Sequence, residues 1–320
     1  MVAQVEHIQA VENIEEILAV DGVDAFIVGP YDLSGSLDSL GDFKDKKMVE
    51  AMGQRTDMTK KTNVSAGFHV VPPKTELVKE KIEEGYTLNI KEPGPMIILS
   101  HPISSETPVY GGGPSPVITP GSRMAKGDSC NTLYIAMTSH TGTHIDLPAH
   151  FALNGRTLTD YDAGFWFSGK VGCVFWHPDR PPEPGTMIRP QDLEQLLEEK
   201  DDLETGCKAV LLKTGFGANR GTELYWKNPP GIDPGLPGFL RHRFPSLRFF
   251  GMDLISVSSF ASREVGRKTH RALLDHPAPI LPIEDMDLTC LPKKVSNLLV
   301  APLYLENGDG APCTVFADIG

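Results

Sequence analysis

Three of the ten histidines of this chain lie in the segment Ser139–His150, which reads Ser-His-Thr-Gly-Thr-His-Ile-Asp-Leu-Pro-Ala-His. His140, His144 and Asp146 offer two imidazoles and a carboxylate, a donor set typical of a catalytic divalent metal site that keeps one position open. The threonines, glycine and proline of the segment disfavour a helix. In an extended segment His144 and Asp146 point to the same side, and His140 can join them through a turn at Gly142. The segment therefore predicts a metal site.

The chemistry expected of such a site is hydrolysis. A bound divalent ion lowers the pKa of water to ~7 and polarises a carbonyl oxygen. His150, four residues after Asp146, can take the proton of that water and pass it to a leaving nitrogen. The sequence has no Gly-x-Ser-x-Gly elbow that would offer an acyl-enzyme route. We therefore expect metal-assisted cleavage of an amide, formamide, lactam or ester in a small-molecule substrate.

The same donor set leaves two other functions open. Two histidines and a carboxylate also form the facial triad of non-haem Fe(II) oxygenases, and oxygen consumption would support that function. A non-catalytic binding module could use the metal for folding alone. Chelation that unfolds the domain, with no hydrolysis of any amide or ester, would support this third possibility.

The elements that must position these residues divide the chain into two parts. Up to about residue 92, helical and strand patterns alternate, which predicts βαβ units and a parallel sheet. The Pro- and Gly-containing stretch Lys91–Pro95 is the expected boundary. The expected strands are Asp24–Gly29 and Val64–Val71, and the expected helices are Glu12–Val20, Phe43–Lys61 and Lys74–Glu84.

From residue 96 to 320, short strand-like runs are separated by long Gly- and Pro-rich loops, such as Gly215–Pro237. This pattern predicts an α+β domain with a β-rich core, whose main helices are Pro190–Lys200 and Gly266–Leu274. Loops of this length are more often functional than idle. The expected strands are Leu133–Thr138, Lys170–Trp176, Ala209–Thr214, Leu247–Leu254, Asn297–Leu305 and Cys313–Ile319.

The histidine-rich segment resembles the signature of the metal-dependent cyclase family, whose members include bacterial kynurenine formamidases (arylformamidases) and isatin hydrolase. The resemblance covers residues ~96–320 and implies a cyclase-like fold that cleaves a C–N bond. Other ordered segments resemble further motifs of the family. They are Ser100–Tyr110, Lys213-Thr-Gly-Phe, Gly251–Ser256, His270-Arg-Ala-Leu-Leu274 and Ile283-Glu284.

The cyclase resemblance also implies a ligand set. His140, His144 and Asp146 would hold a first metal ion. Asp146 could bridge to a second ion that is held also by His270 and Glu284. The site would contain one or two divalent ions, and the ligand types permit zinc or manganese.

Two further roles follow from the resemblance. His150 would be the catalytic histidine that transfers protons. Tyr110 stands where the formamidases place an aromatic side chain that faces the substrate.

Residues ~3–90 carry a second resemblance, to the C-terminal part of the class II 2-oxo-acid aldolases that include 4-hydroxy-2-oxoheptanedioate aldolase. The matching segments include Val5-Glu-His-Ile and Gly29-Pro-Tyr-Asp-Leu-Ser34. It implies that Glu6 and Asp32 occupy the positions of metal ligands. The aldolases are (β/α)₈ barrels, and only the last strands are represented here, without the family's catalytic histidine and substrate-binding arginine. We expect residues 1–92 to be a truncated, inactive (β/α) barrel fragment that binds no metal, with 2-oxo-acid aldolase activity as the alternative.

Composition narrows the class of partner. The chain has 30 Lys and Arg against 42 Asp and Glu, a net charge of −12 that disfavours nucleic acid. No apolar run approaches the ~20 residues of a membrane span, and no signal peptide is visible. The five cysteines include no Cys-x-x-Cys pair, which is typical of reduced cytoplasmic proteins. We expect a cytoplasmic homo-oligomer, a dimer or a tetramer, that acts on a small molecule and binds neither nucleic acid nor a membrane.

Overall fold

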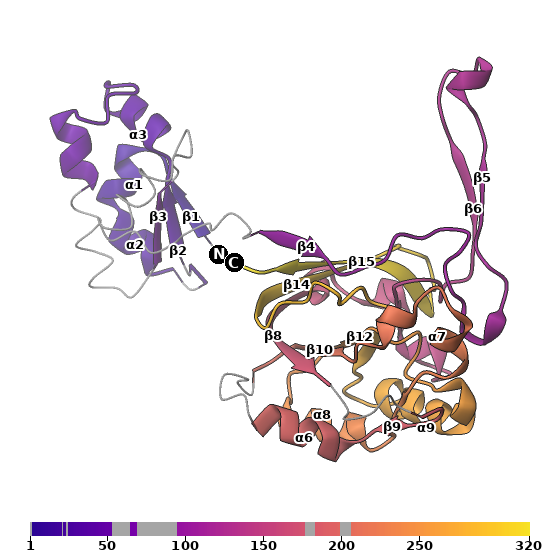
Figure 1. Ribbon diagram of the computed structural model, residues 1–320. Coiled ribbons are helices and arrows are strands. Elements are labelled where there is room, and N and C mark those ends of the chain that lie inside the picture. The colour runs from indigo at the N-terminus through magenta and orange to yellow at the C-terminus, as the bar shows by residue number, and fades with distance from the viewer. Residues whose placement is uncertain are drawn as a thin grey trace. The chain divides into compact units, whose positions relative to one another are not determined.

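A computed structural model describes residues 2–20, 22–23, 25–52, 65–68, 95–176, 183–198 and 206–320. The chain divides into two compact units, Met1–Glu92 and Pro93–Gly320 (Figure 1). The predicted helix Lys74–Glu84, the end of the predicted helix Phe43–Lys61 and most of the predicted boundary Lys91–Pro95 lie outside the described residues.

The first unit contains a parallel sheet with the strand order β1-β2-β3. Its strands are β1 (Val2–Val5), β2 (Ala25–Val28) and β3 (Ser65–Phe68), and its helices are α1 (Ile8–Glu12), α2 (Ile14–Leu18) and α3 (Pro30–Ser36). The single helix predicted at Glu12–Val20 is wrong in its bounds, because two short helices meet at Asn13, which leaves helical geometry. Parallel strands joined by helices occur in several α/β folds, so a fragment of a (β/α) barrel stays a prediction.

The second unit is a mixed helix and strand domain with one main sheet. The strands of this sheet are β4 (Met96–Ile98), β7 (His144–Asp146), β8 (Phe167–Phe175), β10 (Ala209–Lys213), β12 (Phe249–Met252), β13 (Leu281–Glu284), β14 (Val295–Pro302) and β15 (Gly310–Asp318). Its helices are α6 (Pro190–Glu198), α7 (Glu223–Lys227), α8 (Leu236–Arg243) and α9 (Arg263–Leu274).

Seven of these strands close into a barrel in the order β14-β8-β10-β12-β13-β7-β15, because β14 also pairs with β15. β8, β10, β12 and β13 run parallel, whereas β7, β14 and β15 pair antiparallel with their neighbours. β4 adds to β15 outside the ring. The closed ring leaves few unpaired strand edges.

The parallel strands read as continuous apolar runs because both of their faces are covered. Every residue of Ala209–Leu212 and of Phe249–Met252 is buried. Helix α6 packs against β8 and helix α9 against β13, and Figure 1 shows α6, α8 and α9 on the same side of the barrel. The resulting core is one contiguous cluster of buried side chains of the second unit.

A two-stranded hairpin extends away from the barrel (Figure 1). It consists of β5 (Val117–Pro120) and β6 (Leu133–Ala136), which pair antiparallel. The predicted loop Gly215–Pro237 is wrong in part, since it contains α7 and the short strand β11 (Gly231–Ile232), which pairs with β9 (Met187–Ile188). Within this stretch the rings of Phe216 and Tyr225 stack, with centroids 6.2 Å apart.

Candidate metal centre

The predicted metal-binding segment enters the barrel as strand β7. Gly142 has a φ of 65°, a left-handed conformation that favours glycine, so the chain turns before the strand begins. Nδ1 of His144 donates a hydrogen bond to the carbonyl of Gly142 at 2.8 Å. This bond leaves Nε2 of His144 free to face the interior of the site.

Strand pairing brings a distant carboxylate to His144. Its partner in the β7–β13 register is Glu284, the last residue of β13. Nε2 of His144 lies 3.3 Å from Oε2 of Glu284 and 3.4 Å from Oδ1 of Asp146. Residues opposite each other on antiparallel strands have neighbouring side chains, so the register itself builds this part of the site.

Helix α9 supplies the third imidazole of this group. Nε2 of His270 lies 3.4 Å from Oδ2 of Asp146 and 3.4 Å from Oε1 of Glu284. Nδ1 of His270 donates to the carbonyl of Gly266 at 3.0 Å. A Cβ at Gly266 would collide with Ser258, so glycine is required for α9 to approach closely enough. His144 and His270 therefore face the same two carboxylates.

Glu284 is held in place by the loop after β12. Its Oε1 atom accepts a hydrogen bond from the backbone N–H of Val257 at 2.7 Å and from Oγ of Ser256 at 3.2 Å. The other oxygen, Oε2, is the one that faces His144. The carboxylate thus has a fixed orientation in a buried environment.

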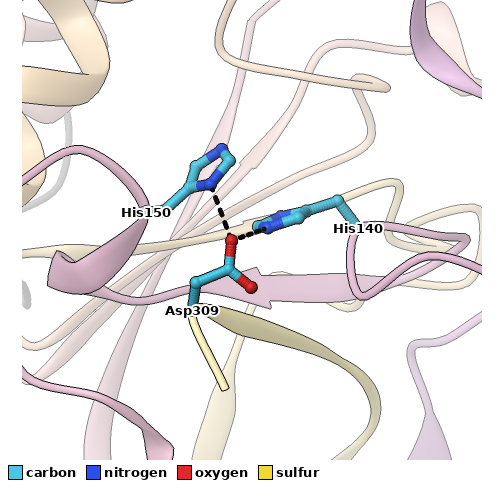
Figure 2. Close-up of side chains that lie close together, drawn as sticks. All are labelled: His140, His150 and Asp309. Carbon is cyan, nitrogen blue, oxygen red and sulfur yellow. Dashed lines mark hydrogen bonds and ion pairs between the residues drawn. The ribbon is translucent and has the colours of Figure 1, made fainter. Parts of the chain in front are cut away.

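His140 and His150 share a carboxylate that the sequence did not predict (Figure 2). Nε2 of His140 lies 2.9 Å and Nδ1 of His150 lies 3.1 Å from the same oxygen, Oδ2 of Asp309. Asp309 directly precedes β15, and Gly310 pairs with Asp146 of β7. A Cβ at Gly310 would clash with the ring of His140. A Gly-Asp-Gly sequence before a predicted strand was the available signal, but it is common in turns.

The other ring nitrogen of His140 joins this histidine to the main group. Its Nδ1 lies 2.8 Å from Oδ1 of Asp146. The structure therefore brings together all of the predicted metal ligands, namely His140, His144, Asp146, His270 and Glu284. The predicted proton-transfer residue His150 lies beside them, with its ring centroid 3.9 Å from that of His140.

The buried carboxylates of Asp146 and Glu284 and the histidines around them shift one another's pKa values. Burial disfavours the charged form of His270, but its close contacts with the carboxylates of Asp146 and Glu284 outweigh burial and raise its pKa to about 10. The same competition raises the pKa of His144 well above its ordinary value. Burial opposes ionisation of Asp146, yet three histidines hold its pKa well below the usual range.

These features fit a divalent cation. Three overlapping groups have ligand atoms within 4.8 Å of one another, namely His140–His144–Asp146, Asp146–His270–Glu284 and His140–His150–Asp309. Oδ2 of Asp146 is buried and has no hydrogen-bond partner. A cation would neutralise the negative charge of this oxygen. It would also take the place of the histidine protons that the neighbouring carboxylates stabilise. Imidazole nitrogens and carboxylate oxygens suit several divalent metals.

The cluster lies in a cavity of 410 Å³. Tyr110 lines this cavity, and its contact with a substrate stays a prediction. Phe151 also lines it and stacks on the ring of His270, with centroids 4.5 Å apart and planes inclined by 11°. The cavity therefore combines polar groups at the cluster with apolar and aromatic surface, as small-molecule sites do.

The two acidic residues singled out in the first unit lie near the carboxyl ends of adjacent parallel strands. Glu6 directly follows β1, and Asp32 lies in the first turn of α3, after β2. Oε1 of Glu6 accepts a hydrogen bond from Gln4 at 2.6 Å. Among the described residues of this unit, no group of three or more potential ligands surrounds them. Their expected lack of metal stays a prediction.

Comparison with known proteins shows which family the chain matches. A model of the family described as "Putative cyclase" matches residues 97–259. The chain belongs to the cyclase family. It is 29% identical over 222 residues to the kynurenine formamidase of Geobacillus thermodenitrificans, an alignment that covers 68% of this chain and 94% of that relative. The match agrees with the predicted resemblance.

Solved structures agree with the cyclase fold. Isatin hydrolase A from Labrenzia aggregata superposes with a TM-score of 0.61 at 22% identity, covering 70% of this chain and 93% of that one. A structure described as a predicted metal-dependent hydrolase, from Bacillus stearothermophilus, gives a TM-score of 0.53 at 23% identity, covering 70% and 97%. At these identities the likeness establishes the fold of the second unit.

The first unit matches a different family. The model described as HpcH/HpaI aldolase/citrate lyase covers residues 1–90. The second resemblance stated from the sequence is therefore confirmed at the level of the family. In the part of the chain that the structure describes, no helix has both the length and the apolar character needed to cross a membrane.

Proposed function

We propose that the cyclase-like domain is a metal-dependent hydrolase that cleaves the C–N bond of a small amide, formamide or cyclic amide. The observation that carries this proposal is the convergence of three histidines and two carboxylates that line one cavity. Relatives named kynurenine formamidase and isatin hydrolase support the same reaction class. We propose the domain bounds 1–92 and 96–320 for the aldolase-like and hydrolase parts.

We propose that His140, His144 and Asp146 hold one ion and that Asp146, His270 and Glu284 hold a second, with zinc or manganese as the metal. When bound, such ions lower the pKa of water and polarise the carbonyl of the substrate. Asp146 belongs to both groups because its two oxygens face different histidines. The hydrogen bonds of Nδ1 in His144 and His270 to backbone carbonyls orient their Nε2 atoms toward the ligand cluster.

His150 is the proposed proton carrier. Asp309 accepts the hydrogen bond of its Nδ1, so the free lone pair is on Nε2. Nε2 accepts a proton from the attacking water while the water oxygen bonds to the carbonyl carbon. The C–N bond then breaks with its electron pair on nitrogen, and His150 returns the proton to that nitrogen. The products are a carboxylic acid and an amine, joined in one molecule when the substrate is cyclic.

Tyr110 is the proposed contact for the body of the substrate. Its ring packs edge-on against Phe260, with centroids 5.7 Å apart. Burial and the charge of Glu284 raise the pKa of its hydroxyl group. A neutral hydroxyl at this position can donate a hydrogen bond to the substrate across a wide range of pH.

Metal content and a substrate panel test the proposal together. The full chain is purified, its metals are measured by mass spectrometry, and formanilide and a lactam series are assayed with zinc or manganese restored. Hydrolysis of a C–N bond that depends on the metal supports the proposal. An active protein without stoichiometric divalent metal would overturn it, as would oxygen consumption in place of hydrolysis.

A further inference from the structure

Two arginines line the cavity beside the ligand cluster. Arg263 and Arg267 belong to α9, the helix that also carries His270, and both contribute to the cavity wall. The three residues are spaced i, i+4 and i+7, which places them on one face of the helix. Along the axis, Arg267 lies about 4.5 Å and Arg263 about 10.5 Å from His270 at 1.5 Å per residue.

Within the described part of the chain, no carboxylate neutralises the positive charge of these arginines. Both side chains are exposed. Arg263 lies over the ring of Phe260, with its Cζ atom 4.9 Å from the centroid. Their charges reach the cavity, because both lower the pKa of Tyr110 against the larger effect of burial.

A third arginine near the site, Arg220, has its charge paired with a carboxylate of the protein. Arg220 donates three hydrogen bonds to the carboxylate of Asp285, at 2.9, 3.2 and 2.8 Å, and this carboxylate also accepts a bond from Tyr225 at 2.7 Å. Asp285 lines the cavity, but its charge is compensated. Among the described residues that line the cavity, Arg263 and Arg267 therefore carry positive charge that no carboxylate neutralises. This contrasts with the chain as a whole, which has a net charge of −12.

We propose that Arg263 and Arg267 bind a carboxylate of the substrate, remote from the bond that is cleaved. This inference rests on the proposed function and narrows its substrate to an amide that carries a negative charge. The guanidinium fork suits a carboxylate in geometry and charge. The helix spacing sets the distance from the scissile carbonyl, near His270, to the carboxylate at about 5–10 Å. Val109, Tyr110 and Phe151 line the same cavity, and their apolar surface suits an aromatic body.

A matched pair of substrates tests the inference. 4-Formamidophenylacetate carries a carboxylate across an aromatic ring from its formamide, and 4-methylformanilide is its neutral counterpart. The metal-loaded full chain should hydrolyse the anion with a kcat/KM about tenfold higher, equivalent to about 1.4 kcal/mol. Arg267→Gln and Arg263→Gln should each remove most of this preference through KM, with a much larger loss of kcat/KM for the anion than for the neutral probe. Lys268→Gln removes the same charge from the same helix without touching the cavity, so it should keep the preference.

The outcomes separate the two proposals. Hydrolysis of both probes with equal kcat/KM, or an equal loss for both in the arginine variants, overturns the carboxylate site and leaves the hydrolase proposal standing. If neither probe is hydrolysed, calorimetry with 4-methylphenylacetate decides the inference without catalysis. Binding that is weakened by Arg267→Gln but not by Lys268→Gln supports the carboxylate site. The absence of binding, or equal binding to all variants, overturns it.

Discussion

Nε2 of His140 lies 2.9 Å from Oδ2 of Asp309, although 169 positions separate the two residues in the chain. The same oxygen accepts a hydrogen bond from Nδ1 of His150 at 3.1 Å (Figure 2). One carboxylate thus orients a proposed metal ligand and the proposed proton carrier together. Burial opposes the charge of Asp309, but its contacts with His140 lower its pKa.

Replacement of Asp309 should impair catalysis through these two histidines. Asp309→Asn is expected to lower kcat by about 10- to 100-fold, the usual effect of removing a carboxylate behind a metal-bound histidine. The measurement is kcat per bound metal, with Asp309→Glu as the variant that restores part of the rate. Ser139→Ala is the control, because Ser139 donates to the other oxygen, Oδ1, and leaves the carboxylate present. An Asn variant with unchanged kcat would contradict the role.

Metal removal should abolish hydrolysis. Chelation is expected to lower the rate below about 1% of its starting value, because the attacking water then has its ordinary pKa. His144→Ala should reduce metal per chain and rate in proportion, since His144 faces both carboxylates. His242→Ala provides a control on a histidine that does not line the cavity. Full activity after complete chelation would refute metal dependence.

His150 should act in proton transfer more than in metal binding. His150→Asn is expected to leave the metal bound and to lower kcat by ~10²–10⁴-fold, as the loss of a general acid and base does. Loss of the metal with an unchanged rate per bound metal would instead identify His150 as a ligand.

The pH dependence of the wild-type rate follows from the same residue. Burial is the largest influence on His150 and lowers its pKa below 6.5, so the ring is neutral at pH 7 and can accept a proton. As the pH falls through this lowered pKa, the base becomes protonated and kcat/KM should decline. The acid limb should therefore lie below pH 6.5 and should be absent in His150→Asn. An acid limb that persists in the variant would assign it to another group.

The two units should be separable in function. The barrel closes on itself and its core consists of side chains of the second unit, so a chain that begins at Glu92 should fold and keep hydrolysis within about twofold. Metal-dependent turnover of this shortened chain is the measurement. A folded but inactive fragment, beside an active full chain, would contradict the idea that residues 1–92 are a remnant. Pyruvate release from a hydroxy-oxo-diacid, abolished by Asp32→Ala but not by Asp146→Ala, would establish the alternative aldolase activity.

The hairpin β5–β6 should mediate the expected association of copies. Leu133, Tyr134 and Ile135 are successive residues of β6 and are exposed by 65%, 62% and 52%. Both faces of the hairpin are therefore apolar, and an isolated two-stranded hairpin is only marginally stable in water. Light scattering should give a dimer or tetramer for the wild type and a monomer for the double variant Leu133→Lys, Ile135→Lys. A wild-type monomer would contradict this prediction.

The sequence by itself determined the local part of the site. The spacing of His140, His144 and Asp146 places their side chains within reach of one another because the segment turns at a glycine and then extends. This geometry depends on a few neighbouring residues, so the residue types are sufficient to predict it. The same motif is sufficient to indicate the cyclase family, to which the chain belongs.

The tertiary structure decided how distant groups complete the site. Glu284, named before only through the family resemblance, faces His144 through the β7–β13 register, and Asp309, which the sequence did not predict, reaches His140 through the β7–β15 pairing. Strand pairing between remote segments depends on the closure of the whole barrel, which no local pattern encodes. For the same reason the sequence could not distinguish Arg220, paired with Asp285, from Arg267 on the cavity wall. Burial and partner geometry decide the role of a charged side chain, and both arise only when the chain has folded.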